Sequence, residues 1–115
     1  MRTLITSGIA ALTIGVAACG GTSTTVVPGK TGINLKVTGS NVTPANPKAT
    51  KGEQVTMTIT TDKDEEVHLH GYDIHFDCKA DQPLSKTFTA DKTGSFEMEL
   101  EKTSTHLTNF DVTPS

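Results

Sequence analysis

The sequence predicts an all-β domain, an antiparallel sandwich or barrel, and three observations support this class. Apolar residues alternate with polar ones in several short runs, which is the period of a strand with one buried face. Clusters of Gly, Pro, Asn and Asp separate these runs at regular intervals. No segment has a helical period long enough to compete. Short strands joined by regular turns are typical of sandwiches and barrels.

Each strand is expected where the alternation is clearest. The runs lie at residues 33–37, 55–59, 67–69, 74–76, 96–100 and 110–112. Turns are expected at residues 41–47, 51–52, 62–64, 80–83 and 91–94. The predicted core includes Phe88 and inward members of these runs: Val37, Val55, Met57, Ile59, Val67, Leu69, Phe76, Phe96, Met98, Leu100 and Val112.

Residues 1–18 have the composition of a targeting segment. Arg2 supplies a positive start, and residues 4–16 are apolar or small and uncharged. The apolar run is shorter than the roughly 20 residues that cross a bilayer, so we expect a removed signal peptide. The end of the run, Val16-Ala17-Ala18-Cys19-Gly20, resembles the bacterial lipobox. This resemblance implies cleavage before Cys19, a diacylglyceryl group on its sulfur, and a location on the outer side of the cytoplasmic membrane. The alternative is an unmodified cysteine near an ordinary cleavage site.

The mature chain divides into a tether and one domain. Residues 19–32 are rich in small polar residues and lack periodicity, which predicts a flexible tether, and residues 33–115 form the predicted domain. The formal net charge is −3 and becomes −4 when Arg2 leaves with the signal peptide. This mildly acidic surface with scattered lysines argues against nucleic acid as a partner. A lipid on Cys19 would leave Cys78 without a disulfide partner in the chain.

Residues 65–78 carry three of the four histidines. If Val67 and Leu69 point into the core, His68 and His70 point outward on one face, with Cβ atoms roughly 6–7 Å apart. Two imidazoles at this spacing can chelate one ion, and imidazole suits copper and zinc. The alternative is that both are solvated strand residues.

The residues after His70 offer further candidate ligands. Gly71 indicates a bulge or bend, after which Cys78 lies on the inward face and His75 on the outward face. Cys78 is most simply a small buried hydrophobic residue, and a metal ligand is the alternative. His106, in the loop predicted before Leu107, is either a ligand or a plain surface histidine.

Four segments together resemble the cupredoxin-like domains of small bacterial envelope proteins. They are Lys51-Gly52-Glu53-Gln54-Val55, the segment from Glu66 to Asp73, Phe88-Thr89-Ala90-Asp91, and Gly94-Ser95-Phe96. The resemblance covers the whole predicted domain and implies a Greek-key β-sandwich of about seven strands. The resemblance does not imply a blue-copper centre, because such centres need a His₂Cys set of ligands, usually with a weak axial Met. Tyr72 stands where the early histidine would be, and the last loop contains no cysteine.

The function expected from these features is metal binding by a lipid-anchored envelope protein. Copper is the expected metal, with zinc or iron as alternatives, held by His68 and His70 with His75 or His106 as third ligand. The expected role is capture and handover of the ion. The sequence contains no recognisable set of catalytic residues, so enzyme activity is not expected. The rival hypothesis is a metal-free interaction or structural lipoprotein that binds an envelope protein. A metal site requires imidazole nitrogens that converge within about 4–5 Å, because each ligand bond is about 2 Å long.

Overall fold

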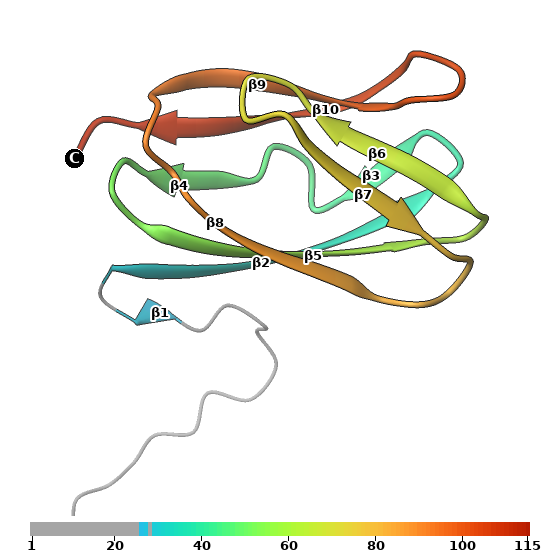
Figure 1. Cartoon of the computed structure of the whole chain (residues 1–115), viewed down its shortest axis with the longest axis horizontal. Helices are drawn as coiled ribbons and strands as arrows, with labels where there is room; N and C mark the ends of the chain where they lie inside the picture. Colours follow the sequence, from blue (N-terminus) through green and yellow to red (C-terminus); the bar gives the residue numbers. More distant parts are fainter. Residues whose placement is uncertain (1–25, 28) are drawn as a thin grey trace, which may run out of the picture.

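The computed structural model describes residues 26–27 and 29–115 of the 115-residue chain. The predicted signal peptide, Cys19 and most of the predicted tether lie outside the described residues. Two sheets form a sandwich, seen as two layers in Figure 1. Within the described residues the chain contains no helix, and hence none that could span a membrane.

The first sheet has the order β1-β2-β5-β8, with β3 paired to β2. Its strands are β1 (Val26–Val27), β2 (Lys30–Thr38), β3 (Asn41–Thr43), β5 (Gln54–Thr61) and β8 (Leu84–Thr89). The central pair β2 and β5 is parallel. Parallel neighbours need a crossover rather than a hairpin, and the chain between them crosses to the other sheet to form β4.

The second sheet has the order β4-β10-β9-β6-β7. Its strands are β4 (Lys48–Thr50), β6 (Glu65–Leu69), β7 (Ile74–Cys78), β9 (Gly94–Leu100) and β10 (Thr105–Thr113). Strands β6, β7, β9 and β10 pair antiparallel, and β4 pairs parallel to β10. The prediction of an all-β sandwich is confirmed, but both sheets are mixed rather than purely antiparallel.

The inward faces of the two sheets form one core. Strand alternation places Val67, Leu69 and Phe76 there with no exposed surface. Every predicted core residue is buried or packs against the buried cluster, Phe88 and Phe96 being the partly buried ones. Burial of such side chains stabilises the fold by roughly 1.5–3 kcal/mol each.

Several segments differ from the sequence-based expectation. Residues 41–43, predicted as part of a turn, form β3, and the short strand β4 was not predicted. Residues 26–27 and 30–32, predicted as tether, lie in β1 and β2. The strand β8 was not predicted, because only Leu84 and Phe88 in it are partly buried and the other residues are exposed. A strand at the end of a sheet with so little burial shows no alternation of polarity.

Candidate metal-binding site

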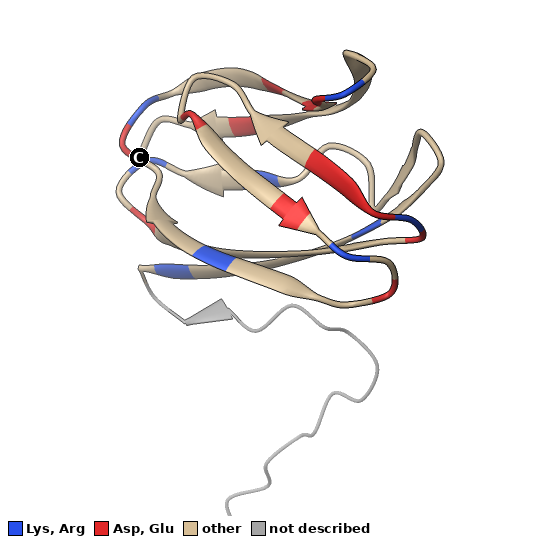
Figure 2. Ribbon diagram, turned by 45° about the vertical axis from the view of Figure 1, so that its right-hand side comes forward, with Lys and Arg blue, Asp and Glu red and all other residues tan. Residues whose placement is uncertain are grey.

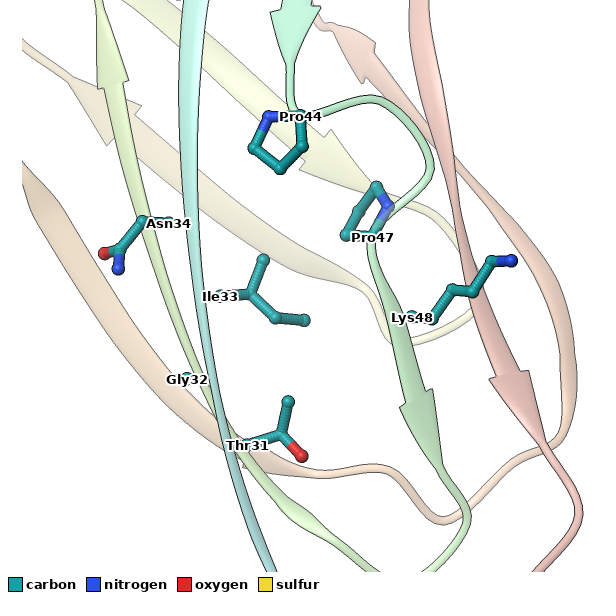
Figure 3. A pocket seen from close by; sticks show the side chains of 7 residues that line it. All are labelled: Thr31, Gly32, Ile33, Asn34, Pro44, Pro47 and Lys48. Carbon is teal, nitrogen blue, oxygen red and sulfur yellow. The ribbon is translucent and has the colours of Figure 1, made fainter. Parts of the chain in front are cut away.

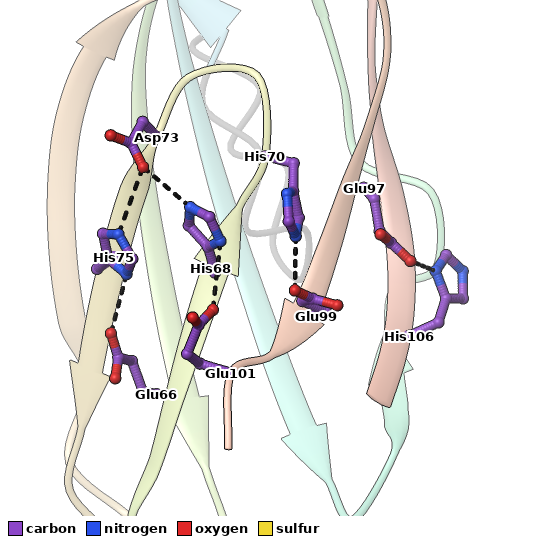
Figure 4. Close-up of polar contacts among 9 residues, drawn as sticks. All are labelled: Glu66, His68, His70, Asp73, His75, Glu97, Glu99, Glu101 and His106. Atoms are coloured by element: carbon purple, nitrogen blue, oxygen red, sulfur yellow. Dashed lines mark hydrogen bonds and ion pairs between the residues drawn. The ribbon is translucent and has the colours of Figure 1, made fainter. Parts of the chain in front are cut away.

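The outward face of the second sheet carries all four histidines in the chain. Three register pairs run across the strands at the same level: His106 with Glu99, Glu99 with His68, and His68 with His75. The row therefore crosses β10, β9, β6 and β7 in order. His70 lies just beyond the end of β6 on the same face, as the alternation from His68 requires (Figure 4).

The His68 ring lies between two other imidazoles. Its centroid is 4.3 Å from that of His70, with the ring planes tilted by 50°, and 4.2 Å from that of His75, with the planes tilted by only 8°. The neighbours leave the His68 side chain 14% exposed, compared with 42% for His70 and 45% for His75. His68 is thus the fixed centre of the cluster.

Each ring nitrogen of His68 has a different environment. Nε2 lies 3.1 Å from Asp73 Oδ1 and donates a hydrogen bond to it, because a carboxylate can only accept. Nδ1 is buried and has no hydrogen-bond partner among the described residues. Glu101 Oε2 lies 3.3 Å from Nδ1, within ion-pair distance but without hydrogen-bond geometry. The lone pair of Nδ1 is free when Nε2 carries the proton, and this nitrogen then faces the Glu101 carboxylate.

Asp73 orients the ring of His68 from the turn between β6 and β7. Its Oδ1 also lies 3.4 Å from His75 Nε2, and the residue has a left-handed backbone with φ of 53°. The hydrogen bond from His68 is the main cause that lowers the pKa of Asp73. The carboxylate is therefore ionised near neutral pH. A metal-binding histidine usually donates a hydrogen bond from its other ring nitrogen to a carboxylate, as His68 does to Asp73.

His70 forms a close pair with a glutamate of the neighbouring strand. Its Nε2 donates to Glu99 Oε1 at 2.6 Å, and the Glu99 side chain is only 15% exposed. This hydrogen bond is the main cause that raises the pKa of His70. Two ligands of one ion lie roughly 3 Å apart when each bond is about 2 Å. The distance between His70 Nε2 and Glu99 Oε1 would need to increase by less than about 1 Å for the two atoms to bind an ion in place of the shared proton.

Two groups of potential ligand atoms share His68. One contains His68, His70 and Glu99, and the other His68, His75 and Glu101, and in each group the atoms all lie within 4.8 Å of one another. The imidazole nitrogens therefore converge as a metal site requires, which favours this interpretation over the metal-free rival.

Ring orientation distinguishes the two groups. A ligand nitrogen directs its lone pair in the plane of its ring. Because the planes of His68 and His75 are stacked and nearly parallel, one ion cannot lie in both planes without a ring rotation. The 50° tilt between His68 and His70 lets the two planes intersect. The group with His70 and Glu99 is the better preformed one.

His106 was predicted to lie in a loop, and this is wrong because it lies in β10. A register shift between His106 and Thr108 reverses the alternation there, so His106 is exposed on the outward face while Phe110 and Val112 point inward. Its Nδ1 donates to Glu97 Oε2 at 2.8 Å. His106 belongs to neither group of potential ligand atoms.

Cys78, the alternative ligand, and Tyr72, at the position of the missing early histidine, both pack against the core. Cys78 is buried on the inward face, with Sγ 3.9 Å from the carbonyl oxygen of Ile59, and burial raises the pKa of its thiol. Tyr72 packs edge-on against Phe96, and its hydroxyl donates to the carbonyl oxygen of Lys92. Neither contributes a ligand atom to the two groups, so the site has only nitrogen and oxygen ligands.

The histidine-bearing strands carry acidic residues and, apart from the histidines, no basic ones. β6, β7, β9 and β10 contain no Lys or Arg, whereas β2, β4 and β8 each contain at least one Lys. Figure 2 shows acidic residues on the ribbons of β6 and β7. Such a one-sided acidic face raises the local concentration of cations.

A pocket away from the histidines, between β2 and the start of β4, has different chemistry. It is lined by residues of β2 and of the segment leading into β4, among them Ile33, Pro44 and Pro47, and has a volume of about 210 Å³ (Figure 3). Lys48 is the single ionisable group in this lining. The pocket therefore offers no set of metal ligands.

Solved structures of similar shape share the fold at low sequence identity. The metal-binding domain of the Cu(I)-exporting P-type ATPase CopA of Streptococcus pneumoniae D39, solved with Cu(I), has a TM-score of 0.66 and 17% identity over 77% of this chain and 91% of that domain. A copper-binding protein in its apo form has a TM-score of 0.65 and 15% identity over 77% of this chain and 93% of that protein.

A chain of a heme-copper terminal oxidase dimer has a TM-score of 0.66 and 12% identity, covering 86% of this chain and 76% of that one. No family model matches the sequence, and no curated protein matches it either. The structural likenesses show the fold alone, which is the cupredoxin-like sandwich that the sequence motifs imply.

Proposed function

We propose that this protein binds a divalent transition-metal ion, copper(II) before zinc(II), through His68, His70 and Glu99. The observation that carries the proposal is the convergence of one ligand atom each from His68, His70 and Glu99, which all lie within 4.8 Å of one another. The buried Nδ1 of His68, which has no hydrogen-bond partner among the described residues, adds a second reason. Leaving a buried polar atom unpaired costs roughly 1–3 kcal/mol. A bound cation would remove that cost. The copper named for two of the structurally similar proteins supports the choice of metal.

The ligand set favours a divalent ion. Cu(I) prefers thiolate and thioether sulfur, whereas imidazole and carboxylate ligands suit Cu(II) and Zn(II), with Cu(II) the tighter of the two at a given site. Cys78 is buried on the other face of the sheet and supplies no sulfur. Without a thiolate ligand the copper-loaded protein would have no intense blue colour.

The residues around the ligands would organise the site. Asp73 holds the Nε2 proton of His68 and so turns the Nδ1 lone pair toward the ion. Glu101, 3.3 Å from Nδ1, would supply a further oxygen or balance charge. Strong covalent or redox chemistry is not required by this arrangement. Reversible capture and handover of the ion is the role that it suits.

The location that we propose is the outer side of the cytoplasmic membrane, held by a lipid on Cys19. This part rests on the lipobox resemblance at residues 16–20. Mass spectrometry of the membrane fraction should find acyl mass on the mature N-terminus. A Cys19→Ser chain should move to the soluble fraction, and a wild-type chain with a free Cys19 thiol would refute the anchor.

Binding is tested by titrating the tag-free chain with Cu(II) and Zn(II) in a calorimeter. We expect one ion per chain, tighter binding of Cu(II), and a large loss of affinity in His70→Ala. The matched control is His106→Ala, which removes an imidazole from the same face but not from the cluster. If wild type binds neither ion below roughly 100 μM, about −5.5 kcal/mol, the proposal is wrong.

A further inference from the structure

On the basis of the proposed function, we infer that the bound ion has a second position at the edge of the sheet, formed by His68, His75 and Glu101, through which it enters and leaves. The ligand atoms of this group lie within 4.8 Å of one another, as they do in the group with His70 and Glu99. His68 belongs to both groups. The ion can therefore keep one ligand while it exchanges the others.

The second position lies on the open side of the cluster. β7, which carries His75, is the last strand of its sheet among the described residues, whereas β6 and β9 each have neighbours on both sides. The oxygen ligand also differs in exposure, because the Glu101 side chain is 41% exposed and that of Glu99 only 15%. An ion at the edge is thus more accessible to water, a chelator or a partner protein.

The carboxylates at this edge would attract the incoming cation. Glu66 Oε2 lies 2.9 Å from Nδ1 of His75, and Asp73 Oδ1 lies 3.4 Å from its Nε2. Glu101 lies on the other side of His68 Nδ1. Three carboxylates therefore surround two stacked imidazoles, and no lysine or arginine occurs on β6 or β7 to neutralise them. An ion that enters from the sheet edge therefore meets these carboxylates before it reaches the group with His70 and Glu99.

Ring freedom makes the second position a transient one. His68 is held between two rings, whereas His75 stacks on one ring and its other side is exposed on the edge strand. His75 must rotate out of its stacked orientation to direct a lone pair at an ion shared with His68. The edge group should consequently bind more weakly than the group with His70 and Glu99. Stepwise replacement of ligands across two neighbouring positions lets a bound ion leave without losing every ligand at once.

The test separates equilibrium affinity from the rate of release. Cu(II) is loaded onto the tag-free full chain, and its removal by excess EDTA is followed by stopped-flow absorbance. We expect His75→Ala to keep its dissociation constant within about threefold of wild type and to release Cu(II) at least about tenfold more slowly. His75→Gln should behave in the same way, and His106→Ala should match wild type in both measurements.

A second arm tests the edge group alone. His70→Ala should still bind one Cu(II), more weakly than wild type, and His70→Ala combined with His75→Ala should bind none below roughly 100 μM. Two results would overturn the second position: release of Cu(II) from His75→Ala at the wild-type rate, or complete loss of Cu(II) binding in His70→Ala. Neither result would refute the proposed function as long as the wild-type chain binds Cu(II). Failure of the wild-type chain to bind would instead refute the proposed function itself.

Discussion

Asp73 offers the sharpest single perturbation of the cluster, because it contacts two histidines and occupies no place in the core. Its Oδ1 lies 3.1 Å from His68 Nε2 and 3.4 Å from His75 Nε2. We predict that Asp73→Gly weakens Cu(II) binding, and that Asp73→Asn weakens it less. Glycine accepts the left-handed backbone of residue 73 without strain and removes the acceptor, whereas asparagine tolerates that backbone and keeps an acceptor oxygen.

The expected loss is set by the exposure of the carboxylate. Removing an outer-shell partner of a metal-binding histidine typically lowers metal affinity by about 10–100-fold. The Asp73 side chain is 86% exposed, so water can replace part of its hydrogen bonding. We therefore expect about a tenfold increase in the dissociation constant of Asp73→Gly, at the low end of that range, and a few-fold increase for Asp73→Asn.

The assay has two readouts, which separate positioning of His68 from a general change of charge. Competition titration gives the dissociation constants, and ¹⁵N chemical shifts of the metal-free protein report the tautomer of His68. Wild type should carry the neutral His68 proton on Nε2, the nitrogen that donates to Asp73. Asp73→Gly should lose this preference. Wild-type affinity in Asp73→Gly, or a wild-type chain with the proton on Nδ1, would refute the role of Asp73.

Three further predictions concern charge, packing and the thiol. Glu99→Gln should lower the raised pKa of His70 toward about 6.5 in an NMR titration, and a variant with an unchanged His70 midpoint would contradict this. In wild type the His70–Glu99 pair stabilises the metal-free fold fully below about pH 6.5, and this stabilisation is lost as pH rises through the raised pKa of His70. Gly71→Ala should lower the melting temperature by an amount equivalent to about 1–3 kcal/mol, because φ is +84° and the new methyl would overlap the Phe96 ring. Cys78→Ala should cost about 1 kcal/mol in chemical unfolding and leave Cu(II) stoichiometry unchanged, and a loss of copper would show that the thiol is a ligand.

The sequence predicts those features of the fold that depend on a single strand, such as which of its side chains point into the core. Alternation in β6 places Val67 and Leu69 inward and therefore His68 outward, and the structure has this arrangement. β8 escaped prediction because its exposed residues carry no such alternation. The parallel pairing of β2 with β5 was missed for a different reason, since periodicity contains no information on which strands are neighbours.

The same limit applies to the candidate site. The outward position of Glu99 follows from the alternation in β9, but its pairing with His68 depends on the register between two strands that are far apart in sequence. Asp73 reaches His68 because the turn reverses the chain at Gly71, and a sequence pattern does not give that geometry. The histidines were therefore visible as candidates while their carboxylate partners were not. The position of His106 depends on a β-bulge between His106 and Thr108, and no residue in that segment is typical of a bulge.

The most direct measurement of the central claim is the electron paramagnetic resonance spectrum of the tag-free chain with one equivalent of Cu(II). We expect a copper signal with nitrogen hyperfine coupling from two imidazoles, without the narrow copper hyperfine splitting of a thiolate-bound centre. His68→Ala should lose the signal of the bound ion because both groups of ligand atoms contain His68. A His68→Ala spectrum identical to that of wild type would contradict the account.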